Sequence, residues 1–382
     1  MTHVVQQNYF NVNSDMSDLL NFELENDSHF HPNLGGITRG GMANHYPMTI
    51  MSMYNLGAND SQIQSFKRHW PRNRALINQD LHLLDNGELT SENWHDYLGQ
   101  SDKLKEFRRI FIGLFIERDI IEVITSLLKK MQNGLPMGLL HPLIRLSFAA
   151  MHGDTGLLAD SLAYMAIRYR DVYQVRHFPK AENPNLADKS ASGNWLVIYQ
   201  LSQKKLLQDH LYNSMYGGSI HICEQLCAST YVHKLALGGS FKVNANCLDA
   251  SVRQICKSSV KLYLFEPKLT TLHAVTGCQA LAELTQRYAI TCGQRNVFAS
   301  LWQRIWVWLT ALYIEKNCPP LTNLPDKITS TSADSWEQLS AKALQTNEVH
   351  VIKMLFSCKW LFEQVAEDPL FHQAARKTLD RT

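Results

Sequence analysis

Apolar residues recur at helical spacing over long stretches of this sequence, and this pattern constrains its fold more than any other feature. Residues 103–131, 156–174 and 277–314 place apolar side chains at i, i+3, i+4 and i+7 through several turns. The sequence shows no series of alternating strands joined by Asn-Gly or Asp-Gly turns. With 382 residues, 45% of them hydrophobic, the chain can bury a large core. The sequence therefore predicts an all-α protein, a large bundle-like domain with long loops and a buried central site.

The composition divides the chain into an N-terminal arm and one helical domain. Residues 1–30 are mostly polar, and we expect them to form a loosely packed arm. Residues 31–382 are expected to form the helical domain. Two segments rich in proline and polar residues, 176–195 and 317–336, are predicted loops. The first of these loops is a candidate boundary between two halves of the domain.

Charge, cysteine content and hydropathy restrict the class of protein. The 37 basic and 35 acidic residues give a net charge of +2, so no nucleic-acid partner is expected. The eight cysteines are scattered through the second half of the chain, as free thiols in a reducing compartment would be. We recognise no signal-peptide pattern and no unbroken membrane span; residues 301–314 come nearest and are interrupted by Gln303 and Arg304. We expect a cytoplasmic protein without a membrane partner, and the oligomeric state is not predicted.

Familiar cofactor motifs are not recognised in the sequence. The glycine-rich stretch GGITRGG, residues 35–41, lacks the preceding strand and the Gly-Lys-Ser/Thr ending of a phosphate-binding loop, so we interpret it as a flexible loop. No GxGxxG follows a strand, which disfavours a flavin or nicotinamide enzyme. The segment HICEQLC, residues 221–227, is not a paired CxxC zinc motif, and its cysteines have the spacing of core residues on one helix face.

Four of the sixteen histidines share an unusual setting, on or next to an apolar helix. His45 and His141 each come just before a proline at a predicted helix start, and His273 follows two threonines that could cap a helix. His350 lies in the apolar stretch 347–356. An unpaired buried polar group costs about 1–3 kcal/mol. One metal ion would satisfy all four imidazoles, which suit iron, zinc, copper or nickel. The alternative is that each is an ordinary core or capping residue.

Lys353 follows His350 by three positions, so the two side chains can face one site. The other positions from Val349 to Phe356 are apolar, and lysine is seldom fully buried without a partner. Burial lowers the pKa of a lysine, and a neutral amine reacts with CO₂ to form a carbamate, which is an anionic oxygen ligand. We interpret Lys353 as such a ligand. The alternatives are a side chain that extends to the surface or pairs with an acid.

Five segments, in this order along the chain, resemble the questin oxidase-like family. They are NHYPMTIMSMYNLGA (44–58), ENWHDYLG (92–99), GLLHPLIRLSFAAMHGD (138–154), LHAVTGCQAL (272–281) and EVHVIKML (348–355). The resemblance implies a largely helical, O₂-using oxidoreductase that acts on an aromatic or polyketide-like substrate by oxygen insertion or C–C cleavage. For members that cleave anthraquinones, it implies a non-haem iron held by histidines and a carboxylated lysine.

Carried over by motif, the resemblance implies a set of metal ligands in this chain. The set is His45, His141, His273, His350 and Lys353. The implied cofactor is Fe(II) or another divalent metal, with O₂ as co-substrate and a CO₂-derived carbamate on Lys353. The chain departs from the expected pattern at Met48 and Arg145, where we expect relatives to carry histidine. Arg145, with Lys353, is a candidate catalytic residue, and it could meet an anionic substrate; the alternative for Arg145 is a structural ion pair with an acid.

Other interpretations remain open at this point. Five aromatic residues are candidate walls for a flat substrate, although core packing explains them equally: Tyr46, Tyr54, Trp302, Trp306 and Trp308. A metal-free Baeyer–Villiger-type oxidase would keep the oxidation chemistry without the metal. A non-catalytic helical scaffold would make the histidines purely structural.

Overall fold

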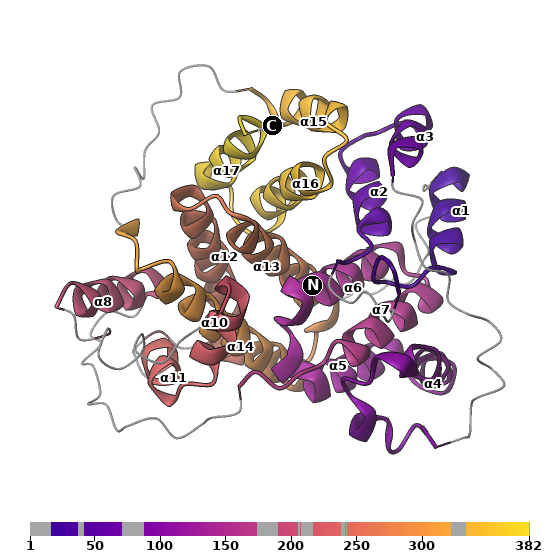
Figure 1. The fold of residues 1–382 in the computed structure, drawn as a ribbon, viewed down its shortest axis with the longest axis horizontal. Coiled ribbons are helices and arrows are strands. Elements are labelled where there is room, and N and C mark those ends of the chain that lie inside the picture. The colour runs from indigo at the N-terminus through magenta and orange to yellow at the C-terminus, as the bar shows by residue number, and fades with distance from the viewer. Residues whose placement is uncertain are drawn as a thin grey trace, which may run out of the picture.

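A computed structural model shows how the helices are arranged (Figure 1). The residues it describes are 17–36, 42–70, 88–173, 190–204, 207, 217–237, 241, 243–321 and 334–381. Within these ranges the chain forms sixteen α-helices and several short 3₁₀ turns, with no strand and an isolated bridge between Asn33 and Ala43. The prediction of an all-α fold is confirmed.

Four helices occupy the centre of the molecule. They are α2 (Tyr46–Asn55), α6 (His141–His152), α13 (Leu269–Tyr288) and α16 (Val349–Gln364). Helix α13 packs against α6 and α16, and α2 closes the set by packing against both α16 and α6 (Figure 1). Because each of the four helices touches two others of the set, segments that are far apart in sequence meet around one point.

The remaining helices cover this central set on two sides. On one side, α7 packs against α6, α4 against α7 and α1 against α2, while on the other side α12, α14 and α17 pack around α13 and α16. Their bounds are α1 (Asp18–Asp27), α3 (Asp60–His69), α4 (Leu104–Glu117), α5 (Ile120–Met131), α7 (Thr155–Ile167), α8 (Ala191–Gln203), α10 (Ser219–Cys227), α11 (Thr230–Leu237), α12 (Leu248–Phe265), α14 (Cys292–Glu315), α15 (Trp336–Gln345) and α17 (Pro369–Leu379).

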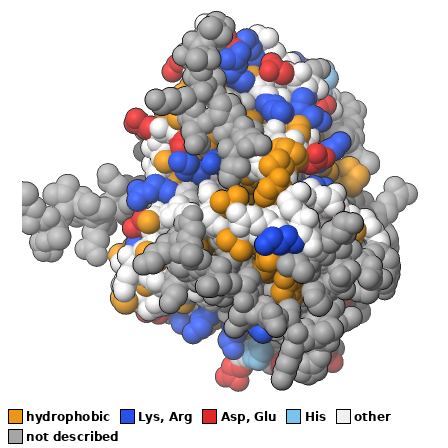
Figure 2. Space-filling model, turned by 90° about the vertical axis from the view of Figure 1, so that its left-hand side faces the viewer, with side chains coloured by type: hydrophobic (Ala, Val, Ile, Leu, Met, Phe, Trp, Pro, Cys, Tyr) orange, Lys and Arg blue, Asp and Glu red, His pale blue; other side chains and the backbone are white. Residues whose placement is uncertain are grey.

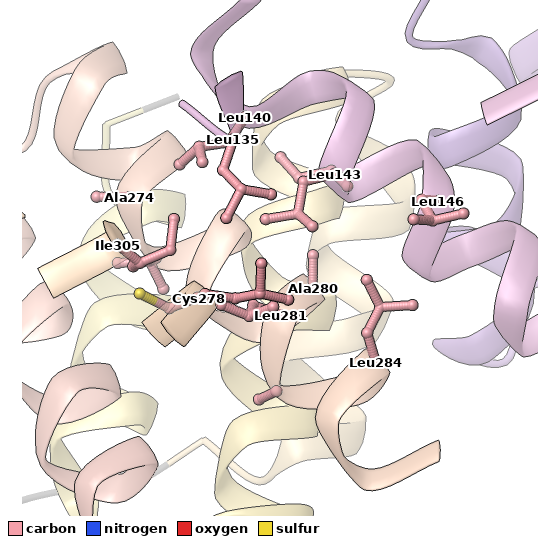
Figure 3. Close-up of a cluster of buried hydrophobic side chains, with 14 of the residues drawn as sticks. Leu135, Leu140, Leu143, Leu146, Ala274, Cys278, Ala280, Leu281, Leu284 and Ile305 are labelled. Carbon is pink, nitrogen blue, oxygen red and sulfur yellow. The ribbon is translucent and has the colours of Figure 1, made fainter. Parts of the chain in front are cut away.

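The contact between α6 and α13 is built from fully buried aliphatic side chains. Leu140 immediately precedes α6 and Leu143 lies in its first turn, while Leu281 and Leu284 come from α13 (Figure 3). Fully burying one such side chain contributes about 1.5–3 kcal/mol relative to leaving it exposed. This contact therefore fixes the relative position of the two helices that carry His141 and His273.

Helix α14 is long and apolar enough to cross a membrane by length and composition, and it is the one such helix among the described residues. Most of its apolar window, 78%, is buried inside the protein, and Trp302 and Trp306 have no exposed surface. A helix that is apolar all round is expected where neighbouring helices cover every face. Helices α10, α11 and α12 supply this cover, so the composition of α14 is explained by the core.

The second half of the expected N-terminal arm is a packed helix, which corrects the prediction of a loosely packed segment. Helix α1 buries Leu24 against the molecule, and its acidic residues Glu23 and Asp27 are also buried. Tyr46 donates a hydrogen bond to Glu23, and Arg145 forms an ion pair with Asp27. The segment looked polar because these buried carboxylates have partners elsewhere in the chain. Residues 1–16 lie outside the described residues.

The predicted loops and thiols can be placed only in part. The central parts of both loops, 174–189 and 322–333, lie outside the described residues, as does most of the glycine-rich stretch. The flanking residues enter helices, since α8 begins at Ala191 and α15 at Trp336. All eight cysteines are free thiols. On the face drawn in Figure 2, the described basic and acidic side chains are interspersed, in keeping with the small net charge.

Candidate metal centre

The four histidines selected from the sequence meet where the N-terminal ends of the four central helices converge. His45 immediately precedes α2, His141 is the first residue of α6, and His350 is the second residue of α16. His273 lies in the second turn of α13. Pro47 and Pro142 lie in the first turns of α2 and α6, where the fixed φ of proline suits a helix start next to His45 and His141.

The imidazole rings form a four-sided arrangement. Around the perimeter, the ring centroids are 4.6 Å apart for His45 and His141, and 4.5 Å apart for His141 and His273. The remaining sides are 5.2 Å for His273 and His350, and 4.8 Å for His350 and His45. The diagonal from His45 to His273 is longer, at 6.5 Å. All four rings therefore surround one small space.

Ring nitrogens of three of the four histidines form a group that could hold one metal ion. One ring nitrogen from each of His45, His141 and His350 lies within 4.8 Å of the other two. The Nε2 atoms of His141 and His273 are 3.0 Å apart. Nitrogen ligands that bind one metal at about 2.0–2.1 Å are separated from each other by roughly 3–4 Å. The 3.0 Å separation of His141 and His273 lies at the lower end of this range, and the 4.8 Å limit for the other three nitrogen atoms extends beyond it.

Hydrogen bonds fix the protonation of the two closest rings. Nδ1 of His141 donates to the carbonyl of Gly138, and Nδ1 of His273 donates to the carbonyl of Leu269 at 2.8 Å. A carbonyl oxygen only accepts, so each Nδ1 carries the ring proton and each Nε2 presents a lone pair. Burial holds the pKa of both rings well below the usual value, so a second proton is disfavoured. Two lone pairs 3.0 Å apart repel each other unless a cation lies between them.

Lys353 lies inside this centre. Its side chain is 1% exposed, and its Nζ atom is 2.9 Å from Nδ1 of His45. Among the described residues no acid pairs with it. Burial lowers the pKa of Lys353 to about 7, which makes the neutral amine available near neutral pH. Lys353 is thus neither exposed at the surface nor paired with an acid among the described residues.

The electrostatic environment of the centre disfavours additional protons. The N-terminal end of an α-helix carries a partial positive charge, and four such ends converge here. The pKa of His350 is lowered to about 3, chiefly by burial and then by the charge of Lys353. The pKa of His45 is lowered by the same two causes. Neutral imidazoles and an anionic group are the ligands that this environment stabilises.

A strained turn sets the position of His141, and sequence reasoning did not find it. Gly138, Leu139 and Leu140 have φ values of 61°, 54° and 65°, in the left-handed region. Leucine in this conformation costs of the order of 1–3 kcal/mol and persists only when its surroundings hold it. Here the turn aims the Gly138 carbonyl at the His141 ring, and Leu140 packs against Gly277 of α13. In the sequence, the sign of this left-handed turn is Gly138, which precedes the two leucines.

Two residues where the sequence departs from the expected family pattern lie beside the centre. Met48 is fully buried on α2, about one turn after His45. Arg145 is buried on α6, one turn after His141, and its Nη2 atom is 3.2 Å from a carboxylate oxygen of Asp27. Among the described contacts Arg145 pairs with this acid and not with a histidine of the centre. The structural ion pair that the sequence left open is therefore present.

The aromatic residues considered as substrate walls have partners in the core. Trp302 donates its indole N–H to Thr285, and Trp306 donates to the carbonyl of Ala236. The Tyr46 hydroxyl donates to buried Glu23. Trp308 is 2% exposed, and Tyr54 is half-buried. The described contacts of the first three are thus those of core residues.

Fold and site together define a class of protein: an all-α domain in which four central helices bring four histidines together, three of them in a group that could hold a metal ion. The family model of the questin oxidase-like proteins matches residues 42–358 of the 382, and the chain belongs to this family. The resemblance noted from the sequence is thereby confirmed. No curated protein matches the chain. The family match includes the four histidines and Lys353, whereas α1 lies outside it.

Proposed function

We propose that this protein is a metal-dependent oxidoreductase that uses O₂ to oxidise an aromatic or polyketide-like substrate by oxygen insertion or C–C cleavage. The observation that supports it best is the pair of facing Nε2 lone pairs of His141 and His273, 3.0 Å apart in a buried site. A divalent cation between them removes the repulsion. Membership of the questin oxidase-like family supports the oxidative chemistry. Fe(II) is the metal we propose first, since imidazole ligands suit it.

The protein's own groups would hold such a metal in a fixed geometry. His45, His141, His273 and His350 supply nitrogen ligands, and the carbonyls of Gly138 and Leu269 keep two of the rings in the tautomer that leaves Nε2 free. Both carbonyls belong to the backbone, so the tautomers of His141 and His273 depend on the local backbone conformation. A metal bound here would supply Lewis acidity and exchange electrons with O₂ and substrate.

Lys353 is proposed to balance part of the metal's charge. Its neutral amine adds to the carbon of CO₂, a C–N bond forms, and one proton leaves to solvent, which gives a carbamate anion. Four neutral imidazoles leave a divalent ion with its full charge, and the carbamate offsets one unit of it. The convergent helix N-termini also favour an anion at this position.

Metal analysis of anaerobically purified protein tests the proposal. We expect a stoichiometric metal content in the wild type and its loss in the double variant His273→Ala/His350→Ala, because two of the four proposed nitrogen ligands are removed together. His233→Ala is the matched control, since His233 is a partly buried histidine that bonds to the Cys227 carbonyl on α10, outside the cluster. Substoichiometric metal in the wild type, or full retention in the double variant, contradicts the metal site.

Oxygen consumption distinguishes the metal-dependent reaction from the metal-free oxidase considered above. With a hydroxylated anthraquinone as the probe, we expect O₂ uptake by the wild type that stops when the metal is stripped and returns when Fe(II) is restored. Uptake that survives exhaustive chelation would favour the metal-free alternative. Stoichiometric metal without O₂ uptake on any hydroxylated aromatic probe would favour a scaffold with a structural metal.

A further inference from the structure

One face of helix α6 connects the metal centre to a cavity. His141, Arg145, Phe148 and His152 are spaced by four, three and four residues, so they follow one side of the helix. Beyond His141, this face borders an almost entirely apolar cavity between α1, α2, α6 and α7, whose opposite wall includes Met48. Phe148 also contacts Phe356 of α16, with ring centroids 5.2 Å apart. Two of the helices that build the centre, α2 and α6, therefore line the cavity, and Phe148 links it to α16.

Two polar atoms on the residues that line this cavity lack partners. The guanidinium of Arg145 uses Nη2 for Asp27, while its Nη1 is buried and makes no hydrogen bond. The ring of His152 donates from Nε2 to the Asn21 side-chain oxygen at 2.9 Å, which leaves Nδ1 as an acceptor, also buried and without a hydrogen bond. The two side chains are 6% and 7% exposed. Buried polar atoms are normally paired, so this arrangement indicates a missing partner.

The chemistry of the two atoms is complementary to a single kind of ligand. Arg145 offers a charged donor and His152 a neutral acceptor, because burial lowers the pKa of the His152 ring and keeps it unprotonated near neutral pH. Between them, Met48, Met51, Phe148 and Leu24 present apolar surface. A hydroxylated aromatic acid has all three features: an anionic oxygen, an apolar ring and a hydroxyl that donates.

A second cavity adjoins this one and shares part of its lining. A larger cavity of about 510 Å³, lined mainly by polar residues of α1, α4 and the start of α7, shares Leu24, His152 and Leu157 with the inner one. His152 thus stands between the two. The inner cavity holds about 20 Å³, so an aromatic ring enters only when neighbouring side chains move. Met48 and Met51 are suited to this because methionine is unbranched and flexible.

We infer that this cavity is the substrate-binding pocket and that it selects a hydroxylated aromatic acid, whose anionic oxygen binds Nη1 of Arg145 and whose hydroxyl donates to Nδ1 of His152. The inference rests on the proposed function, because it places the substrate along the α6 face that begins at His141. Guanidinium groups can bind two acceptors at once, so Arg145 keeps its contact with Asp27 when the ligand is bound.

Ligand binding to the full-length, metal-stripped protein tests this inference without depending on turnover. The probes are a hydroxynaphthoic acid with its carboxylate and hydroxyl at opposite ends, its methyl ester, and the naphthoic acid that lacks the hydroxyl. Titration calorimetry is expected to show the hydroxy acid binding about tenfold or more tightly than the ester, and several-fold more tightly than the acid without the hydroxyl. Equal affinities for acid and ester, or no binding of any probe, overturn the inference.

Two variants assign the effects to the two residues. Arg145→Lys keeps a positive charge opposite Asp27 but loses the second N–H group of the guanidinium that would bind the ligand. We expect it to weaken binding of the hydroxy acid about tenfold and to leave the affinity for the ester unchanged. His152→Phe should remove only the extra affinity that the hydroxyl group provides. Matched controls are Arg304→Lys, whose guanidinium lies over the Tyr173 ring, and His233→Phe. Unchanged affinity in Arg145→Lys overturns the assignment.

The same protein samples separate the two proposals. Metal content is measured before the metal is stripped for the titrations. Stoichiometric metal without discrimination among the three probes overturns the substrate pocket and leaves the metal centre standing. Discrimination among the probes in a protein that never binds metal overturns the metal centre and leaves the pocket standing.

Discussion

At the scale of single residues, Lys353 shows how burial changes the chemistry of a side chain. An ammonium group in water is strongly hydrated, but Lys353 is 1% exposed beside four imidazoles. Desolvation lowers its pKa to about 7, so roughly half of the amine is neutral at neutral pH. The 2.9 Å contact with Nδ1 of His45 keeps it in the centre. The proposed carbamate depends on this neutral amine, which a surface lysine would not supply at neutral pH.

Replacement of this amine should remove both the carbamate and the charge balance. In ¹³C-bicarbonate, we expect the metal-loaded wild type to show a carbamate resonance that Lys353→Met lacks, and the variant should bind metal about 10–100-fold more weakly. Carbon-13 NMR and a competitive chelator titration measure the two effects. Lys316→Met is the control, since Lys316 is a largely buried lysine paired with Glu315. A carbamate signal that persists in Lys353→Met would show that another amine reacts.

At the scale of secondary-structure elements, the turn before α6 and the helix α13 are fitted to each other. Gly277 follows His273 by one turn on α13, and a Cβ atom placed there would come within 3.0 Å of Cβ and Cγ of Leu140 and closer still to its Cδ1. Leu140 belongs to the left-handed turn that leads directly into His141. The absence of a side chain at one position of α13 thus sets how closely His141 approaches His273.

Gly277→Ala should therefore weaken the metal centre although it improves helix propensity. Alanine favours a helix interior over glycine by about 0.8–1 kcal/mol, whereas overpacking a core costs about 1–3 kcal/mol. We expect a lower melting temperature, measured by calorimetry, and weaker metal binding, measured by chelator titration. Gly113→Ala on α4 is the matched control, because a Cβ there meets nothing within 4 Å, and it should stabilise the protein. Equal stabilisation by both substitutions would show that Leu140 adjusts without cost.

At the scale of the whole molecule, buried ionic groups link the N-terminal helices to the central set. Asp27 of α1 pairs with Arg145 of α6, and Arg108 of α4 pairs with Asp160 of α7 at 2.6 Å. Such pairs specify which helices meet, but their desolvation offsets much of the attraction. Burial dominates at Asp160, whose pKa is raised to about 6 in spite of the neighbouring Arg108.

The stability of the molecule should therefore depend on the protonation of Asp160. Because its pKa in the folded protein lies above the ordinary value of 3.8, the stabilisation from the protonated form is complete below about pH 4 and is lost as the pH rises through about 6. We expect the free energy of unfolding of the wild type, minus that of Asp160→Asn, to fall between about pH 4 and about pH 6 and to stay level at higher pH. Urea unfolding at several pH values measures this difference. Asp102→Asn, at an exposed position, is the control variant. A rise of this difference with pH would mean that the ion pair with Arg108 outweighs the burial of Asp160.

Local sequence patterns predicted the long apolar helices and, together with the family resemblance, suggested the candidate residues. Helical spacing of apolar residues depends on neighbours three and four positions away, so α4, α7 and α14 are predictable from short windows. An imidazole or amine in an apolar helix is unusual within its own segment, which is why His350 and Lys353 were noticed. Polar α1 was not recognised as packed, because the partner of its Asp27 lies 118 positions further along the chain.

Contacts between distant segments decided the rest. His141 and His273 are 132 positions apart, and Lys353 and His45 are 308 apart, so no local pattern predicts that their nitrogen atoms meet. The tautomers, the left-handed turn at Leu139 and the unpaired atoms of Arg145 and His152 also appear only in three dimensions. The sequence by itself determined an all-α chain with histidines and a lysine in apolar helices. The tertiary structure alone decided that they share one centre. Residue spacing along a single helix does not determine how far apart different helices lie, and the packing of α2, α6, α13 and α16 sets those distances.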